Sequence, residues 1–92
     1  MPQVLVKLYT TLRQRLGKTQ VWVEGATAAD AVGRVAALGG AGTSQILFDE
    51  KGAVRNEFLL ALDSEILDRN ALDQVQLKEG NVLHIFPPIS GG

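Results

Sequence analysis

The sequence contains no cysteine and only one histidine among its 92 residues. Without cysteine the chain can form no disulfide framework, thiolate nucleophile or cysteine-based metal site, and a lone histidine is a poor basis for a metal site. Lysine and arginine are spread singly, and the net charge is −1, so no basic face for nucleic acid is indicated. There is no apolar run of membrane-spanning length and no secretion signal. We therefore expect a cytoplasmic protein that binds neither nucleic acid nor membrane.

Patterns for phosphate binding and for hydrolysis are missing as well. The glycine-rich residues 39–44 are followed by no lysine and come after a predicted helix, so they do not fit an ATP phosphate loop. No nucleophile-elbow pattern surrounds Ser44, Ser64 or Ser90. A Ser-His-acid hydrolase that uses His84 is therefore not supported, and His84 is most simply a residue on the surface of a sheet. We expect this chain to bind no cofactor and no metal of its own.

What the sequence does contain is the pattern of one small α+β domain. A hydrophobic fraction of 46% in 92 residues is enough for a single modest core. Apolar and polar residues alternate in four stretches, which predicts strands at residues 3–9, 19–24, 57–62 and 82–86. A brief return strand is expected at residues 65–67. Residues 12–18 are more polar and predict a helical turn or a wide hairpin loop.

One helix is expected between the second and third strands. Thr27 supplies a capping hydroxyl, and Asp30 places a carboxylate at the positive end of the helix dipole. An apolar stripe that should pack on the sheet consists of Ala28, Ala31, Val32, Val35 and Leu38. The pair Gly39-Gly40 is expected to end the helix with a left-handed cap. The remaining glycine-rich residues are interpreted as a linker to a short helical turn at residues 44–48.

This order of elements is that of the β-grasp, or ubiquitin-like, fold. We predict a mixed sheet of four to five strands packed on one main helix. The first and last strands would be central and parallel, an arrangement that requires a crossover such as the helix provides. Residues 1–86 would form the folded domain and residues 87–92 a flexible C-terminal tail.

The tail has an unusual composition. Pro87 and Pro88 lack backbone donors and hold φ near −65°, so the strand should end at Phe86 and leave the domain as a stiff, extended segment. Ile89 and Ser90 follow, and Gly91-Gly92 is bare backbone that could enter a channel too narrow for any β-carbon. Residues 88–92 would reach about 17 Å. A Gly-Gly terminus alone would indicate little, because many chains end in small flexible residues.

The combination of Phe86-Pro87-Pro88 with Gly91-Gly92 resembles the MoaD/ThiS family of ubiquitin-like sulfur carriers. In that family the small subunit of molybdopterin synthase ends in the pattern Phe-Pro-Pro-aliphatic-small-Gly-Gly. Further likenesses are the turn from Arg13 to Gly17, Leu47-Phe48-Asp49 before a turn, and Lys78-Glu79-Gly80-Asn81 before the last strand. The chain departs from the family at Leu62-Asp63-Ser64, where many relatives have Val-Asn-Gly.

The resemblance implies a protein cosubstrate and not an enzyme. In such carriers an ATP-dependent activating enzyme adenylates the terminal glycine, here Gly92, and a sulfur donor converts it to a thiocarboxylate. Gly91 would thread the partner's channel. In the molybdopterin branch the tail would enter the large synthase subunit and give its sulfur to the pterin precursor. Two alternatives stay open: a ubiquitin-like modifier joined to lysines through Gly92, and a sulfur donor for cysteine, thiamine or tRNA thiolation.

A docking face for these partners is expected on the sheet surface that the helix leaves open. Alternation places Tyr9, Leu59, Ala61, Ile66, His84 and Phe86 on that surface, next to the exit formed by Pro87 and Pro88. Phe86 lies at the root of the tail and is the expected anchor. The alternative is that these residues are scattered or covered by a loop.

Overall fold

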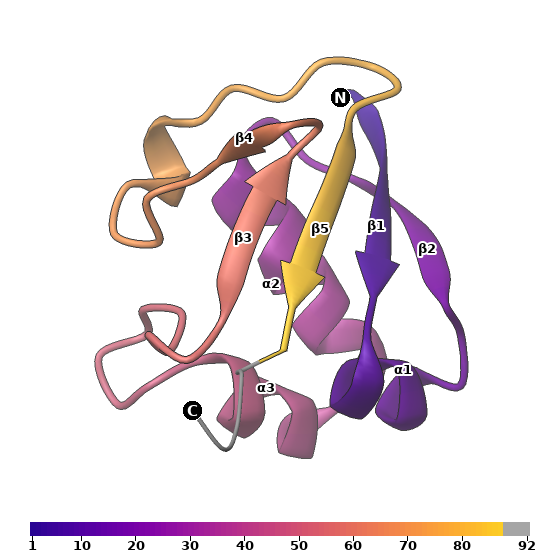
Figure 1. The fold of residues 1–92 in the computed structure, drawn as a ribbon, viewed down its shortest axis with the longest axis vertical. Helices are drawn as coiled ribbons and strands as arrows, with labels where there is room; N and C mark the ends of the chain where they lie inside the picture. Colours follow the sequence, from indigo (N-terminus) through magenta and orange to yellow (C-terminus); the bar gives the residue numbers. More distant parts are fainter. Residues whose placement is uncertain (88–92) are drawn as a thin grey trace.

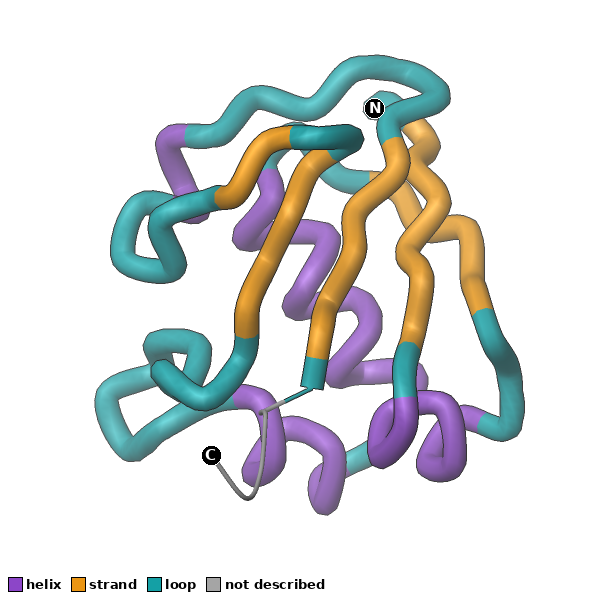
Figure 2. Tube along the Cα trace, viewed as in Figure 1, coloured by secondary structure: helices purple, strands orange, loops and turns teal. Residues whose placement is uncertain are grey.

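The chain folds into a five-stranded sheet with one long helix packed across one of its faces (Figure 1). We describe residues 1–87 in a computed structural model of the protein, leaving out the side chain of Ala41. The predicted flexible tail therefore lies, apart from Pro87, outside the described residues. Figure 2 shows that the helical segments lie on one side of the sheet and at one of its ends.

The sheet has the strand order β2-β1-β5-β3-β4. The bounds are Gln3–Leu8 for β1, Gln20–Glu24 for β2, Leu59–Leu62 for β3, Glu65–Ile66 for β4 and Val82–Phe86 for β5. The strands β1 and β5 are parallel, and every other neighbouring pair is antiparallel. The prediction that the first and last strands are central and parallel is confirmed, as is the β-grasp fold.

The main helix, α2 at Ala28–Gly39, begins where the sequence predicts. The Thr27 hydroxyl accepts a hydrogen bond from the Asp30 N–H at 3.3 Å, and the Asp30 carboxylate accepts one from the Thr27 N–H at 3.1 Å. This reciprocal capping box satisfies two backbone donors at the helix start. Gly40 follows the last turn with φ 84° and ψ −175°, so the helix ends at a positive φ but not in the left-handed helical conformation that the sequence predicted.

The apolar stripe of α2 is confirmed except at its last member. Ala28, Ala31, Val32 and Val35 are buried, but Leu38 is 61% exposed, which corrects the prediction that it packs on the sheet. The last turn of α2 has reached the outer strand of the sheet, where Leu38 lines a groove beside Val23 of β2. Ala36, two residues earlier on α2, is buried, although the predicted stripe did not include it.

Two shorter helices lie at the end of the sheet where β1 and β5 finish (Figure 1). The first, α1 at Thr10–Leu16, buries Leu12 and ends at Gly17, which adopts φ 71° and donates its N–H to the Arg13 carbonyl. The second, α3 at Ala41–Leu47, starts earlier than the helical turn predicted at residues 44–48. Most of the glycine-rich stretch that we interpreted as a linker is therefore helical, and buried Thr43 donates its hydroxyl to the Gly39 carbonyl.

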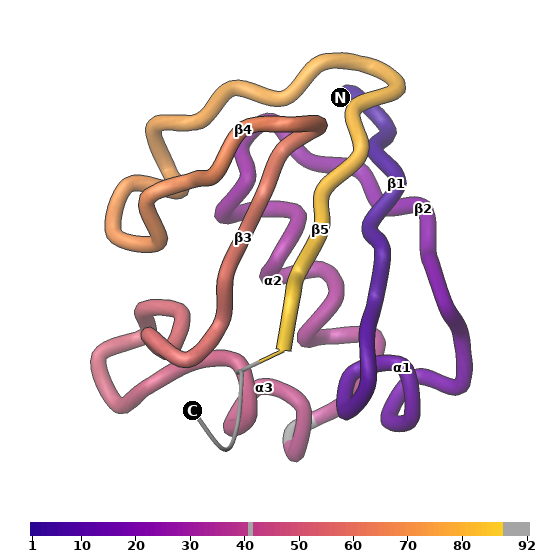
Figure 3. Tube along the Cα trace, viewed as in Figure 1, coloured from indigo at the N-terminus to yellow at the C-terminus, as the bar shows by residue number. Residues whose placement is uncertain are grey.

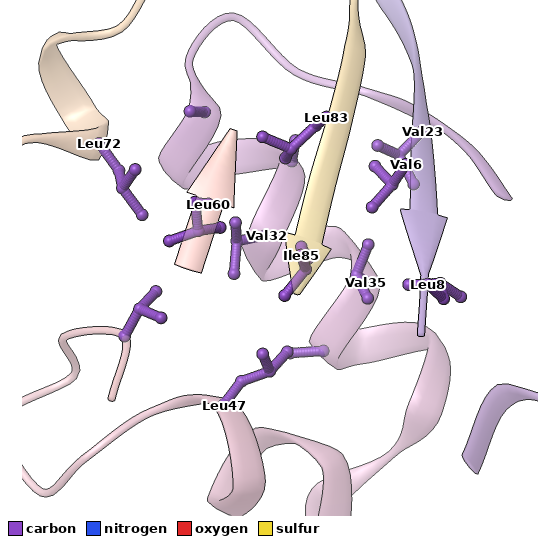
Figure 4. Close-up of a cluster of buried hydrophobic side chains, with 14 of the residues drawn as sticks. Val6, Leu8, Val23, Val32, Val35, Leu47, Leu60, Leu72, Leu83 and Ile85 are labelled. Atoms are coloured by element: carbon purple, nitrogen blue, oxygen red, sulfur yellow. The ribbon is translucent and has the colours of Figure 1, made fainter. Parts of the chain in front are cut away.

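The core lies between α2 and the inner face of the sheet. Figure 4 shows that it combines side chains from the strands with side chains from the helices. Leu83 and Ile85 of β5 are fully buried, as predicted, and Leu47 of α3 closes the core near the end of β5. A short 3-10 helix, η1 at Leu72–Gln74, contributes Leu72. Because the inward side chains of β5 are held in this way, the outward side chains of the same strand have fixed positions.

Two aspartates cap turns in the second half of the chain. Asp63, in the β3–β4 turn, has φ 54°, and its carboxylate accepts hydrogen bonds from the Val82 N–H and the Asn81 amide. At the start of the connection to β3, Asp49 caps a turn. Desolvation acts to raise the pKa of Asp49, but hydrogen bonds from the N–H groups of Ala53 and Lys51 and the positive charges of Arg55 and Arg69 together lower the pKa below its usual value.

The burial of α2 predicts different costs for two truncations on the same helix. Val35→Ala should lower the free energy of unfolding by about 2 kcal/mol, because it opens a cavity in the core. Leu38→Ala should change it by less than about 0.5 kcal/mol, because the side chain is exposed. Urea unfolding of both variants checks this. A cost at Leu38 equal to that at Val35 would show that Leu38 is a core residue after all.

Candidate functional site

The strand β5 carries the tail out of the middle of the sheet. It lies between β1 and β3 and runs to the end of the molecule where α1 and α3 lie (Figure 3). Phe86 is its last residue, as predicted, and Pro87 follows, partly buried. Pro88, Gly91 and Gly92 lie outside the described residues, so the tail-threading and reactive roles expected of them remain predictions.

Three rings gather beside this exit, on the sheet surface that faces away from α2, which we call the open face. His84 and Phe86 stand two residues apart on β5 and therefore point the same way, while Tyr9 directly follows the neighbouring strand β1. The ring centroids are 5.0 Å apart for Tyr9 and Phe86 and 5.4 Å apart for His84 and Phe86, and both pairs are nearly parallel. We call these three residues the aromatic cluster. All three residues of the cluster are partly buried.

A hydrogen bond closes the aromatic cluster. The Tyr9 hydroxyl and Nδ1 of His84 lie 3.0 Å apart, and the tautomer of the imidazole decides which of them donates. The bond fixes His84 against a tyrosine and not against a serine, which gives a Ser-His-acid arrangement no support. The side chains nearest the tail exit thus form a rigid apolar platform with two polar atoms paired inside it.

The other predicted members of the open face divide into two groups. Leu59 is 45% exposed and Ile66 is 65% exposed, so both offer apolar surface for docking. Ala61 is only 6% exposed, which corrects its predicted place on a docking surface. The Ala61 side chain does point to the open face, but it is short and stands between His84 of β5 and Ile66 of β4, its partners on the two neighbouring strands.

The structure adds three residues to the open face that the sequence analysis did not include. Trp22 of β2 is 60% exposed, and its neighbours across the sheet are Leu5 of β1 and then Val82 of β5. Leu5 and Val82 are partly buried. Val21 and Val23 are buried, so alternation along the strand already predicts that the Trp22 side chain points to the open face. Only the register across the sheet shows that Trp22 forms a row with Leu5 and Val82.

The described residues hold no other candidate for chemistry. Within residues 1–87, no three His, Asp or Glu side chains come together where they could hold a metal ion. Over the same residues, no helix has the length and apolar character needed to cross a membrane. The described part of the site is thus an aromatic and apolar surface beside Pro87.

The sequence matches one family model, and the fold matches solved structures. The model of a family described as the ThiS family matches residues 6–92. No curated protein matches the sequence at a significant level.

Solved structures match over nearly the whole chain. Small archaeal modifier protein 1 from Haloferax volcanii is 22% identical with a TM-score of 0.82, and the match covers 98% of this chain and 99% of that one. A chain of the BexX/CysO complex from Amycolatopsis orientalis is 21% identical, with a TM-score of 0.79 and coverage of 97% and 99%. A chain described as molybdopterin converting factor subunit 1, from Pyrococcus furiosus, is 22% identical, with a TM-score of 0.72 and coverage of 97% and 100%.

The Tyr9–His84 contact predicts a measurable coupling. Tyr9→Phe keeps the stacked ring and removes the hydroxyl, and it should cost about 1 kcal/mol of unfolding free energy. The same change in a His84→Ala background should cost close to nothing, because the partner of the hydroxyl is already gone. Urea unfolding of the wild type, the two single variants and the double variant gives this coupling energy, and equal costs in both backgrounds would contradict the hydrogen bond.

Proposed function

Because the chain belongs to the ThiS family of ubiquitin-like sulfur carriers and modifiers, we propose that it is a sulfur carrier whose reactive group is the carboxylate of Gly92. The observation that carries the proposal is the family match over residues 6–92, which takes in the Gly91-Gly92 pair. The chain acts as a protein cosubstrate: it brings the group to be modified, and partner enzymes supply the catalytic residues.

The chemistry requires two partners in turn. A terminal carboxylate, with a pKa of about 3.5, is ionised at neutral pH and is a poor electrophile. An ATP-dependent activating enzyme joins it to the α-phosphorus of ATP and releases pyrophosphate. Hydrosulfide released by a donor then attacks the acyl carbon of the adenylate; the new C–S bond replaces the bond to the phosphate oxygen, and AMP leaves, giving the thiocarboxylate. ATP is bound by the activating enzyme, and this chain needs no cofactor of its own.

The aromatic cluster gives these partners a place to dock beside the reaction. Phe86 is the last residue of β5, one residue before Pro87, and its ring stacks on the rings of both Tyr9 and His84. A partner that packs on Tyr9, His84 and Phe86 would therefore hold the root of the tail at a fixed distance from its own active site. Fixing the root lowers the entropy that the tail loses on entering a channel. Leu59 and Ile66 would widen the contact.

The sulfur acceptor we propose is the pterin precursor of molybdopterin, bound by a large synthase subunit. The Phe86-Pro87-Pro88 exit supports this branch, and the Pyrococcus furiosus neighbour described as molybdopterin converting factor subunit 1 has the same fold. The likeness to small archaeal modifier protein 1 supports a second candidate, in which Gly92 is joined to lysines of target proteins. Both functions use the same activated terminus.

Intact-mass analysis tests the carrier proposal. After incubation with the activating enzyme, ATP and a sulfur source, the protein should gain the mass that replaces one oxygen by sulfur. A variant with one residue added after Gly92 should gain none, because its former carboxylate is an amide, and its unfolding free energy should stay unchanged. Loss of the sulfur to a pterin precursor would identify the branch. Gly-Gly remnants on many cellular lysines, without a thiocarboxylate, would instead establish the modifier function.

The docking role of the aromatic cluster predicts a second effect. Phe86→Arg should weaken binding to the activating enzyme by about 2 kcal/mol or more, because a central aromatic anchor is lost and a charge is placed in the contact. The folded domain should lose only about 1 kcal/mol, from the stacked contacts. Titration calorimetry and urea unfolding measure the two effects.

Gln74→Arg is the control for that experiment. It adds the same charge at an exposed position of η1, a helix that packs against α2, and should leave binding as in the wild type. If Phe86→Arg binds the activating enzyme as tightly as Gln74→Arg does, the aromatic cluster is not part of the interface.

A further inference from the structure

The outer edge of β2 is a free strand edge. β2 ends the sheet on one side, and within the described residues its only partner is β1 (Figure 1). The opposite edge, β4, has only two residues. Natural proteins protect long edges with prolines, bulges, inward-pointing charges or charged side chains along the edge. β2 has no proline, its register with β1 is continuous and its inward residues are Val21 and Val23; its only charge, Glu24, is its last residue.

The hydrogen bonds to β1 show which backbone groups face that edge. The Leu8 N–H donates to the Thr19 carbonyl at one end of the pair, and the Gly25 N–H donates to the Pro2 carbonyl at the other. Antiparallel ladders alternate, so Val21 and Val23 also direct their backbone groups toward β1. The N–H and C=O groups of Gln20, Trp22 and Glu24 therefore point outward, toward the free edge.

This set of groups is self-complementary. If a second copy of β2 lies antiparallel along the edge with the two Trp22 residues opposite each other, Gln20 of each copy faces Glu24 of the other. Every residue in these pairs has its backbone groups directed at the partner, so the ladder closes as in an ordinary antiparallel sheet. A register shifted by one residue would oppose backbone groups already bonded to β1.

The side chains agree with the same register. The outward row of the segment runs Lys18, Gln20, Trp22, Glu24, all exposed, from a positive to a negative end. In the antiparallel pair, Glu24 of one copy is the diagonal neighbour of Lys18 of the other, and the two-fold axis repeats the contact. Opposite charges meet twice, and the two exposed indole rings meet at the centre.

Space for a second strand is present beside β2. A groove of about 450 Å³ runs along it, lined on one side by Trp22, Val23 and Glu24 and on the other by Arg34, Ala37 and Leu38 of α2. Trp22 and Leu38 are among the most exposed large apolar side chains of the described residues, at 60% and 61%. Leu38 is thus exposed on the α2 side of this edge, and Trp22 is exposed on its open-face side.

We propose that two copies of this chain associate through their β2 edges, antiparallel about Trp22, to form one continuous ten-stranded sheet. The strand that pairs with this edge comes from a second copy of the chain, because the segment is complementary to itself. Its backbone register, the order of its charges and its central Trp22 all fit an antiparallel pair of two such segments. The inference does not depend on the proposed function: β1 separates β2 from β5, so the aromatic cluster and the tail root remain accessible in the dimer.

Sedimentation equilibrium of the full chain measures the association. Trp22→Lys should weaken dimerisation roughly thirtyfold or more, because it removes the central ring from both copies and opposes two positive charges. Ile66→Lys is the matched control: it places the same charge at a similarly exposed position, 65%, on the opposite edge of the sheet, and should leave dimerisation unchanged. Thermal unfolding of each variant verifies that both are folded.

A charge exchange separates the proposed register from other modes of association. Lys18→Glu and Glu24→Lys should each weaken the dimer, since each brings like charges together across the axis, and the double variant should regain the lost affinity. If the double variant is as weak as the single variants, or if both single variants dimerise as the wild type does, the register is wrong.

Amide hydrogen exchange locates the contact in the wild-type chain. The amides of Gln20, Trp22 and Glu24 should be protected at high protein concentration and exposed on dilution, while those of Val21 and Val23 stay protected at both. A protein that remains a monomer up to about 1 mM, with the three outward amides exchanging freely, would overturn the proposal.

Discussion

The parallel pairing of β1 with β5 is the contact on which the rest of this structure depends. It joins the two ends of the chain, with Leu5 beside Val82 and Leu8 beside Ile85. Parallel neighbours cannot be joined by a tight turn, so the chain must leave the sheet between them, and α2 is the part of that path that covers the core. The same pairing places Phe86 beside Tyr9. The pairing that closes the sheet therefore also positions the aromatic cluster at the tail root.

Features set by neighbours in the sequence were predicted well. The start of α2 depends on Thr27 and Asp30, three residues apart, and the inward residues of β5 follow from strict alternation. The glycine-rich residues 39–44 were misread because glycine favours loops in isolation. In the folded chain the buried Thr43 and its hydroxyl bond to Gly39 hold the first turn of α3, and tertiary contact outweighs local preference.

The candidate site was predictable in its parts but not in its arrangement. The sequence placed Tyr9, His84 and Phe86 on one surface, yet their stacking depends on the register between β1 and β5, which no local pattern contains. The burial of Ala61 depends likewise on the size of its two cross-strand neighbours. Trp22 alternates with Val21 and Val23 but was left out of the predicted face, because only the sheet order shows that Leu5 and Val82 connect it to the rest of the open face.

The position of β5 also decides how the protein bears a mechanical load. A partner that draws the tail along the axis of β5 loads the strand in shear against β1 on one side and β3 on the other. In that geometry the ladder hydrogen bonds on both sides share the force and must break together, whereas an edge strand pulled sideways would lose them one at a time. The start of β5 is tied as well, through the Asp63 carboxylate on Val82. The strand that leads to the terminus is thus the one held on both sides by neighbouring strands.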